Sequence, residues 1–461
     1  MLETVELPVW VLVLIGLFAV ISAAERVMFP SVRWFFRRRA ERVVARLNKR
    51  LTRPIQPFKL ARRHDMIQQI LYDPEVIRAV NEHADKEGVP DNVAFETAER
   101  YAREIVPAFS ATLYFAFGIR LARWLAKSLY RVRMLNRDPE VINGIDPDAT
   151  VVFVINHRSN MDYVLVTYLV APDSALSYAV GEWARVWPLR PLIKMMGGYF
   201  IRRNSRNALY RKVLARYVQL STKNGVTQAI FPEGGLSRNG ALGAPKLGLI
   251  SYILDGFDPK GPADVVFVPV GLNYDRVLED RVLMADHTKV GARFRFRMST
   301  VFRYIGRHLW QRLTGRFHRL GFAGVSFGDP VSLRSCLDHD GTCRPDNLAA
   351  RLMQEVGHAV PVLPVPLVCH VFEQTGYRID RQVLQQEFEH LLGRISPEVS
   401  VCLPKAGPEN AVSEALRMLE ARGVISVDGD VIAVTDRYPE LIGFYAASLA
   451  HVLQDIKLQN P

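Results

Sequence analysis

The stretch from Thr150 to Phe327 constrains the fold most, because short apolar segments alternate there with helical patterns. This alternation is typical of a mostly parallel β-sheet flanked by helices. The sequence therefore predicts an α/β domain over residues 146–335. The expected strands are Val151–Ile155, Leu176–Ala179, Gly198–Ile201, Thr227–Phe231, Val265–Val270 and Gly324–Phe327, and the expected helices are Glu182–Met196, Ala208–Thr222 and Leu247–Leu254.

Mostly helical regions are expected on both sides of this domain, over residues 31–145 and 336–461. In the first, apolar residues of Phe109–Met134 are followed by basic ones, which predicts either an interfacial membrane helix or a buried helix. In the second, Asp428-Gly429 predicts a tight hairpin turn. Helices before a hairpin are also typical of a winged helix, but nearby acidic residues suit a phosphate backbone poorly. The helical patterns are Asp73–Glu87, Asn92–Val106, Asn347–Val360, Asp380–Leu392 and Asn410–Ala421, with a last helix ending near Leu453.

Residues 1–30 are predicted to anchor the chain in a membrane. The segment Leu7–Ala24 is uncharged and close to the roughly 20 residues that a spanning helix needs. A cleavable signal peptide is the alternative, because Ser22, Ala23 and Ala24 are small, but Glu3 and Glu6 precede the apolar run where positive charge is expected. Arginines between residues 26 and 50 place the later domains in the cytoplasm. We expect a single N-terminal pass in the cell inner membrane.

The net charge of +12 is unevenly distributed. Arginines crowd residues 293–319 and are interleaved with aromatic side chains, a mixture that suits an anionic phospholipid surface or nucleic acid. Because the chain already carries a predicted anchor, we expect a phospholipid surface and no nucleic acid. A solvated helix face with core aromatics is the other interpretation. The four cysteines show no zinc-binding spacing, so reduced thiols and no metal are expected: Cys336, Cys343, Cys369 and Cys402.

The pair His157 and Asp162 follows directly behind the first expected strand. Ligands of open α/β sheets bind at the carboxyl ends of the strands, so His157 is well placed to act as a base. A carboxylate on its second ring nitrogen fixes the tautomer and stabilises the imidazolium. This spacing also arises by chance, and a turn with a capping aspartate is the alternative.

Three further clusters lie at the ends of later strands. Arg202 and Arg203 follow an apolar strand, and guanidinium groups bind phosphate in a bidentate manner. In FPEGGLSRNG, Gly234 and Gly235 let the backbone approach a ligand, and basic residues lie just beyond. The block Val268-Pro269-Val270-Gly271, with Asn273 and Tyr274, is a candidate wall of an acyl or thioester channel.

In this order the clusters resemble the glycerolipid acyltransferases, whose pattern is HxxxxD, GxxFIxR, FPEG or FVEG, and an apolar block with proline. HRSNMDYVLVTY, GGYFIRR, FPEGGLSRNG, VPVGLNYDRV and VSFGDPVSL are similar to the bacterial membrane glycerol-3-phosphate acyltransferases. The resemblance implies transfer of a fatty acyl group from an acyl-CoA or acyl carrier protein thioester to glycerol 3-phosphate, without a further cofactor. A monoacylglycerol 3-phosphate acceptor, giving phosphatidate, is the alternative.

The resemblance also implies residue roles. His157 is the general base and Asp162 orients it. Arg202, Arg238 and Lys246 contact phosphate, and Glu233 helps to shape the acceptor pocket. The full expected substrate-binding set is Arg202, Arg203, Glu233, Gly234, Gly235, Ser237, Arg238 and Lys246.

Two departures from the pattern leave the acceptor open. Leu236 stands where the family usually has arginine, so either Arg203 or Arg238 compensates or the acceptor differs. Asn160 stands where that branch commonly has histidine, which is a milder change.

Two other functions fit parts of the sequence. Gly324-Val325-Ser326-Phe327-Gly328 satisfies the GxSxG pattern of hydrolases, but Asp329-Pro330 follows where a helix is required. A membrane-anchored, non-catalytic lipid-binding protein explains the charge but not the four ordered clusters.

Overall fold

The computed structural model describes residues 8–10, 13, 16, 38–39, 41–136, 144–170, 173–187, 189–202, 205–287, 319–338 and 341–453. The chain divides into two compact units, Met1–Pro54 and Ile55–Pro461. The expected anchor Leu7–Ala24 and the basic segment 293–319 lie almost entirely outside the described residues. Within the described ranges, no helix has both the length and the hydropathy that crossing a membrane requires.

The second unit is built on a mostly parallel sheet, as the sequence predicts. In the described part of the chain this sheet has eight strands in the order β1-β7-β6-β2-β5-β3-β4, with β8 beside β6. All neighbours pair in parallel except β6 with β7 and β6 with β8. The bounds are β1 (Arg131–Leu135), β2 (Thr150–Ile155), β3 (Ser177–Val180), β4 (Gly198–Phe200), β5 (Gln228–Ile230), β6 (Val265–Tyr274), β7 (Phe322–Phe327) and β8 (Val331–Ser332).

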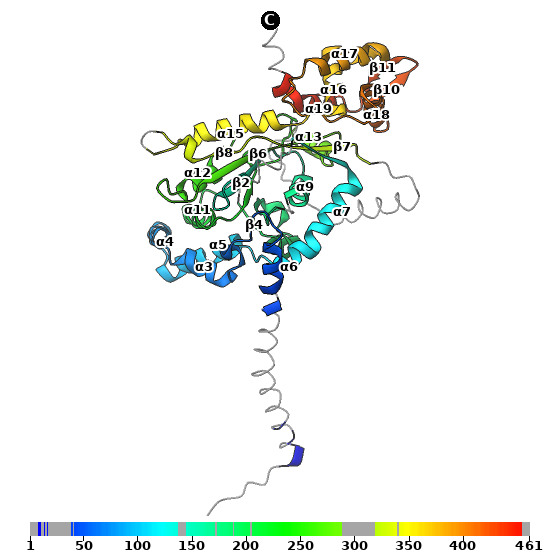
Figure 1. Ribbon diagram of the computed structural model, residues 1–461. Helices are drawn as coiled ribbons and strands as arrows, with labels where there is room; N and C mark the ends of the chain where they lie inside the picture. Colours follow the sequence, from blue (N-terminus) through cyan, green and yellow to red (C-terminus); the bar gives the residue numbers. More distant parts are fainter. Residues whose placement is uncertain are drawn as a thin grey trace, which may run out of the picture. The chain divides into compact units, whose positions relative to one another are not determined.

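Helices cover both faces of this sheet (Figure 1). In β2, Val151 and Phe153 belong to one apolar cluster, and Val152 and Val154 to another. Successive side chains of a strand point to opposite faces, so a continuous apolar run predicts burial on both. The first cluster includes side chains of α7 (Ile119–Leu129) and α9 (Met161–Val170), and the second includes those of α11 (Ala208–Lys223), α12 (Gly248–Asp255) and α15 (Pro345–Ala359).

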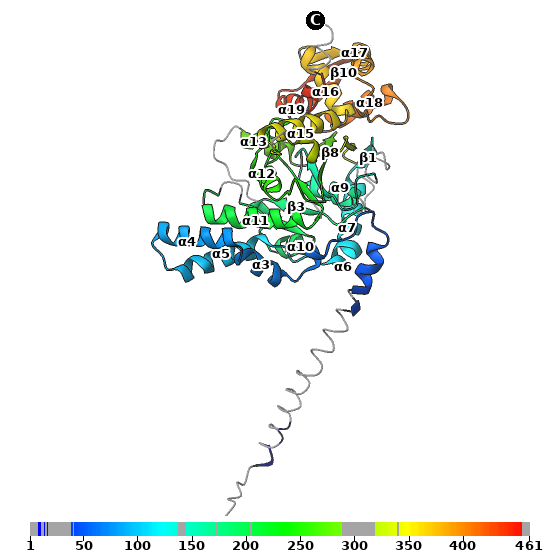
Figure 2. The same ribbon diagram turned by 60° about the vertical axis from the view of Figure 1, so that its left-hand side comes forward.

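Helices α3 (Arg63–Leu71), α4 (Pro74–Glu87) and α5 (Asp91–Ile105) lie beside α11 (Figure 2). The short helix α2 (Pro57–Leu60) precedes them. Asp73 caps α4 by accepting a hydrogen bond from the backbone N–H of Glu75 at 3.1 Å, and Pro74 stands at its first position. Gly88 ends α4 in the left-handed conformation with φ 65°. The expected helices Asp73–Glu87 and Asn92–Val106 are confirmed.

The expected helix Phe109–Met134 is only partly correct. The chain forms α6 (Ala111–Leu113), a π-helix η1 (Tyr114–Gly118) and α7, and it then continues as β1. Tyr130 is extended at the end of α7, and Arg131 pairs with Phe322 of β7. The helix ends because the edge of the sheet offers backbone hydrogen bonds, a long-range effect that helical periodicity does not reveal. Strand β1 also precedes residue 146, where the sequence places the start of the α/β domain.

The expected helix Glu182–Met196 is likewise interrupted. The structure has a 3-10 helix, η2 (Glu182–Ala184), and then α10 (Leu189–Met195). The sequence contains Pro188, and a proline disfavours helical backbone at the residue before it, here Trp187.

The C-terminal region is mostly helical and contains the expected hairpin. Strands β10 (Ile425–Asp428) and β11 (Val431–Val434) pair in an antiparallel manner, and β9 (Arg378–Asp380) pairs with β11. Gly429 lies in the turn with φ 56°. The helices are α16 (Pro364–Gln374), α17 (Arg381–Arg394), α18 (Pro408–Glu420) and α19 (Glu440–Ala446), with short 3-10 turns η3 (Arg334–Cys336) and η4 (Ala447–Leu449) elsewhere.

Candidate active site

The ends of β2 and β5 bring the first and third sequence clusters together. These strands are parallel neighbours, with Val154 paired to Ile230. The residues after them, His157 and Glu233, therefore leave the same edge of the sheet. The backbone N–H of His157 donates to Oε1 of Glu233 at 2.7 Å, and the backbone carbonyl of His157 accepts from the N–H of Ser237 at 2.9 Å.

His157 and Asp162 form a hydrogen-bonded pair. The distance from His157 Nδ1 to Asp162 Oδ2 is 2.9 Å, and both side chains are buried. Asp162 lies in the first turn of α9, where a carboxylate is stabilised by backbone N–H groups. The N–H groups of Arg158 and Ser159 donate to the same Oδ2 at 2.7 and 3.0 Å. The aspartate thus caps the turn, as one interpretation of this pair predicts, and it also contacts the imidazole. The catalytic role of the pair stays a prediction.

Tyr274 holds the other oxygen of Asp162. Its hydroxyl donates to Oδ1 at 2.6 Å. Burial, followed by the charge of Asp162, raises the pKa of Tyr274 well above its usual value, so the hydroxyl remains a donor. The sequence predicts Tyr274 as a candidate channel wall, and it also predicts that the strand ends at Val270. The structure extends β6 to Tyr274, and this extension carries the hydroxyl to Asp162.

The second ring nitrogen of His157 contacts no polar group in the part of the chain that the structure describes. His157 Nε2 is buried and has no hydrogen-bond partner among the described residues. The imidazole lies against two aromatic rings, with centroid distances of 4.4 Å to Phe231 and 5.4 Å to Tyr163. With Nδ1 facing a carboxylate, the neutral imidazole carries its proton there and presents a lone pair at Nε2. This arrangement can accept a proton from a hydroxyl that reaches Nε2.

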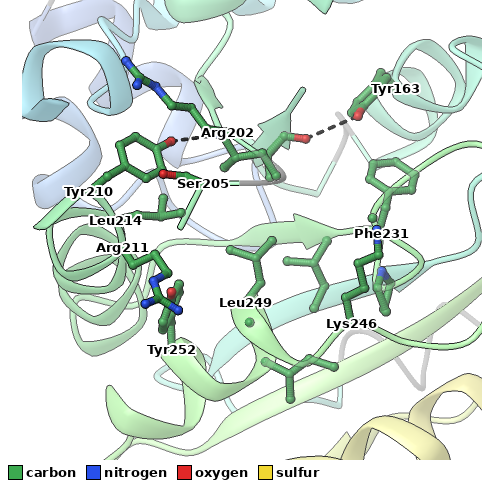
Figure 3. Close-up of a pocket in the computed structure, with 17 residues that line it drawn as sticks. Tyr163, Arg202, Ser205, Tyr210, Arg211, Leu214, Phe231, Lys246, Leu249 and Tyr252 are labelled. Carbon is green, nitrogen blue, oxygen red and sulfur yellow. Dashed lines mark hydrogen bonds between the residues drawn. The ribbon is translucent and has the colours of Figure 1, made fainter. Parts of the chain in front are cut away.

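A cavity of about 250 Å³ lies next to these aromatic rings (Figure 3). Phe231 and Tyr163 line it, together with residues that follow β4, from α11 and from the start of α12. The lining is mostly apolar, with three basic side chains: Arg202, Arg211 and Lys246. Phe231 and Lys246 lie at one end, Arg211 and Tyr252 at the other, and Leu249 lies between them (Figure 3).

Only some of the expected substrate-binding residues line this cavity. Lys246 lines the cavity and runs over Gly234, where an added Cβ would lie 2.7 Å from Cδ of the lysine. Arg202 lines the cavity too, but its guanidinium forms a bidentate pair with Glu104, with nitrogen-oxygen distances of 3.0 and 2.7 Å. Arg238 is exposed, and Arg203 lies outside the described residues. Phosphate contact therefore remains a prediction for all four.

Glu233, Gly235 and Ser237 belong to the loop that supports His157. Glu233 Oε2 accepts from the N–H of Gly243 at 2.8 Å, in addition to the His157 contact. The hydroxyl of Ser237 donates to the carbonyl of Ala241 at 2.7 Å, and Gly235 is partly exposed. The side chains of Glu233 and Ser237 thus brace the loop internally, whereas the sequence predicts them as substrate contacts.

Several residues near the site carry no motif signal that singles them out. Glu279 accepts from the Ser159 hydroxyl at 2.7 Å and from the Asn160 N–H at 3.2 Å. The Arg158 guanidinium is buried, donates to the carbonyl of Gly240 and lies 5.7 Å from the centre of the Phe444 ring of α19. Gly240 has φ 84°, and an added Cβ would lie 1.7 Å from the carbonyl oxygen of Phe444. The C-terminal region therefore packs directly on the loops that contain Arg158 and Gly240.

Ser326 does not form a nucleophile elbow. It lies inside β7, is 1% exposed, and its hydroxyl is 2.8 Å from that of Ser400. A hydrolase nucleophile requires a turn between a strand and a helix. The four cysteines are free thiols, as expected.

The buried carboxyl groups predict how stability depends on pH. Burial raises the pKa of both Glu233 and Asp275 to about 7. Between pH 4.5 and 7 the folded chain therefore binds more protons than the unfolded chain, so the free energy of unfolding falls as pH rises through this range. We expect Glu233→Gln to remove the part of this pH-dependent fall in the free energy of unfolding that Glu233 causes, on the order of 1 to 3 kcal/mol. Urea unfolding at a series of pH values measures it.

Glu398→Gln is the matched control for this experiment, because Glu398 is exposed. For the control variant, the free energy of unfolding should change with pH at the same slope as for the wild-type chain. Asp275 contributes separately and remains in both variants. Equal slopes for Glu233→Gln and the wild-type chain would contradict the assignment.

Two family models match separate segments of the chain. A model described as Acyltransferase matches residues 132–273, and one for the glycerol-3-phosphate acyltransferase C-terminal region matches residues 310–454. Over these two segments the chain is similar to the glycerol-3-phosphate acyltransferases. The first match includes His157 and Glu233, and the second includes Phe444, which contacts Arg158 and Gly240.

Curated relatives show the same similarity. A glycerol-3-phosphate acyltransferase of Shewanella loihica is 27% identical over 445 residues, which cover 89% of this chain and 52% of the relative. One of Pseudomonas putida is 29% identical over 282 residues, which cover 60% of this chain and 33% of the relative. The chain spans about half the length of the first of these relatives.

Among solved structures, the 1-acyl-sn-glycerophosphate acyltransferase of Thermotoga maritima is 19% identical, and its match covers 53% of this chain and 78% of that one. The TM-score is 0.31, a likeness too slight to bear on fold or function.

Proposed function

We propose that this chain transfers a fatty acyl group from an acyl thioester to the 1-hydroxyl of glycerol 3-phosphate. The observation that carries the proposal is the geometry of His157. Asp162 orients the imidazole through Nδ1, and Nε2 has no hydrogen-bond partner among the residues that the structure describes. Its position within a segment matched by the acyltransferase family supports the reaction class. The relatives named glycerol-3-phosphate acyltransferase support the acceptor.

In the proposed reaction, Nε2 of His157 takes the proton of the acceptor hydroxyl as its oxygen attacks the thioester carbonyl carbon. A new C–O bond forms, and the carbonyl electrons move to oxygen. Collapse of this tetrahedral intermediate breaks the C–S bond, and the imidazolium returns its proton to the departing thiolate. Asp162 stabilises the imidazolium by its charge, and Tyr274 with the two N–H groups keeps the carboxylate in position.

Access to Nε2 requires local movement. His157 is 1% exposed and Phe231 is 7% exposed, so the acceptor hydroxyl reaches the imidazole only when neighbouring side chains shift. Phe231 contacts His157 and also lines the cavity, so we propose that its ring moves aside to admit the acceptor hydroxyl. Lys246 and Arg238 are the proposed contacts for the acceptor phosphate, since the Arg202 guanidinium is already paired with Glu104.

We place this chemistry at the cytoplasmic face of the inner membrane, with acyl-CoA or acyl carrier protein as donor. The apolar segment Leu7–Ala24 and the arginines after it support this location. On α7, Trp124 is 49% exposed beside the exposed Arg123, a combination that suits phospholipid head groups.

A 1-acylglycerol 3-phosphate acceptor is the second candidate, because position 236 is leucine. Leu236 packs against the apolar core and supplies no charge for the phosphate. The test gives the purified chain in detergent an acyl thioester with either acceptor and measures free thiol. We expect thiol release at least about tenfold faster with glycerol 3-phosphate, a ratio that about 1.4 kcal/mol of transition-state binding provides.

Faster release with the monoacyl acceptor would move the chain to the second acylation step. Thiol release at the same rate without any acceptor would contradict acyl transfer and indicate hydrolysis. The same measurements with His157→Ala separate enzymatic from spontaneous thioester hydrolysis.

A further inference from the structure

The turn between β2 and α9 carries His157 and takes its hydrogen bonds from side chains. A chain that enters a helix leaves its first N–H groups without backbone acceptors. Here the N–H groups of residues 157–161 donate to side-chain oxygens, over distances from 2.7 to 3.2 Å. The acceptor side chains are those of Glu233, Asp162, Glu279 and Ser159. His157 therefore keeps its place in the site only while these acceptors keep theirs.

Glu279 provides two acceptors to this turn from a distant part of the chain. Its Oε1 accepts from the N–H of Asn160 at 3.2 Å, and its Oε2 accepts from the Ser159 hydroxyl at 2.7 Å. The oxygen of that hydroxyl in turn accepts from the N–H of Met161 at 3.1 Å. Ser159 is 0% exposed, and a buried donor that loses its partner is costly. Without the Glu279 carboxylate, the turn must therefore change shape to satisfy these donors.

The position of Glu279 is itself fixed. Its backbone carbonyl accepts from two N–H groups in the first turn of α13 (Asp280–His287), both at 2.9 Å. The next residue, Asp280, pairs with Arg422 of the C-terminal region, and the Tyr445 hydroxyl donates to the same carboxylate at 2.6 Å. Glu279 thus offers the turn a well-held acceptor, and the C-terminal region helps to hold it.

We propose that Glu279 is a positioning residue for acyl transfer, an inference that rests on the proposed function. Its carboxylate holds residues 158–161 in the shape that lets Asp162 contact Nδ1 of His157. Glu279 acts through Ser159 and does not touch the reacting atoms. A misplacement of about 1 Å at the catalytic group can cost on the order of 100-fold in rate, so a distant change of this kind is measurable.

Kinetics of two variants test the proposal. Glu279→Ala should lower kcat about 10- to 100-fold, with KM for the thioester and for glycerol 3-phosphate within about twofold of the wild-type values. Glu279→Gln keeps one oxygen as an acceptor and should lower kcat by a smaller factor, about threefold to tenfold. This variant also covers the case in which the alanine variant fails to fold. A raised KM with an unchanged kcat would make Glu279 a substrate contact and overturn the proposal.

Two control variants separate positioning from a general loss of stability. Glu355→Ala makes the same substitution at a partly buried glutamate of α15 and should leave kcat unchanged. Ile70→Ala removes a side chain that is 0% exposed on α3, so it lowers stability without touching the turn. It should keep the wild-type kcat below its melting temperature. An equal fall in kcat in Ile70→Ala would assign the effect of Glu279→Ala to stability and overturn the proposal.

Amide hydrogen exchange observes the turn without any reaction, because local opening sets the exchange rate. In the full chain without substrates, Glu279→Ala should speed exchange about tenfold or more in the peptide that covers residues 156–162. Exchange in α11 should stay unchanged. Faster exchange, together with no acyl transfer to glycerol 3-phosphate by the wild-type chain, would refute the proposed function and leave Glu279 as the residue that shapes the turn. Equal exchange in the variant and the wild-type chain would overturn the assignment of Glu279.

Discussion

His157→Ala should lower acyl transfer at least about 100-fold, and up to 10,000-fold, because general-base catalysis typically contributes rate factors of this size. The alanine removes the group that takes the acceptor proton and that returns it to the thiolate. Steady-state release of thiol with glycerol 3-phosphate measures the loss. A reduced kcat with a nearly unchanged KM for both substrates is expected, since the imidazole acts in the transition state.

Three further variants make this result interpretable. Asp162→Asn should also reduce kcat strongly, because it can no longer stabilise the imidazolium. Tyr274→Phe leaves one oxygen of Asp162 without its 2.6 Å donor and should reduce kcat less. His358→Ala alters a histidine whose side chain is 55% exposed on α15 and should have no effect. Activity of His157→Ala within a few-fold of wild type, in a chain with unchanged thermal stability, would sink the mechanism.

Arg422→Ala should lower the free energy of unfolding by about 3–5 kcal/mol, because it leaves a buried carboxylate without its cation. Arg422 pairs with Asp280 of α13 (Asp280–His287), and their side chains are 6% and 5% exposed. The Tyr445 hydroxyl donates to the same oxygen of Asp280 at 2.6 Å. These three groups join the C-terminal region to the segment that follows β6. Urea unfolding followed by circular dichroism measures the change.

The exposed pair Arg344 and Asp346 provides the matched control. Their side chains are 69% and 51% exposed, so Arg344→Ala should cost less than about 1 kcal/mol. The double variant Arg422→Met with Asp280→Asn removes both charges and should recover much of the stability lost in Arg422→Ala. A single variant as stable as the wild-type chain would show that the buried pair does not hold the two regions together.

Local sequence patterns predict much of the sheet. The continuous apolar run Thr150–Ile155 and the turn residues after it correctly indicate a strand buried on both faces. Helix α11 is equally clear, since Asn207 caps it and a side-chain oxygen there accepts from the N–H of Tyr210. Strand β1 is missed because its residues read as the end of an amphipathic helix. Only its pairing with β7, far along the chain, makes it a strand.

The candidate site likewise combines contacts that the local sequence predicts with contacts that depend on the tertiary structure. His157 and Asp162 are five positions apart, so a single turn suffices to bring them together, and the sequence pattern contains that geometry. Glu233 is recognised by its motif, but its contact with the backbone of His157 depends on the parallel pairing of β2 with β5. Arg211 carries no motif signal, and it reaches the cavity only because α11 packs beside α12.

By itself, then, the sequence determined the kind of sheet, the order of the four clusters and the histidine-aspartate pair. These depend on periodicity and on contacts between residues close in the chain. The tertiary structure decided that Tyr274 donates to Asp162, that Arg202 pairs with Glu104, and that the C-terminal region rests on Gly240. Such contacts join residues far apart in the chain. They arise from strand pairing and side-chain packing, which local sequence patterns do not predict.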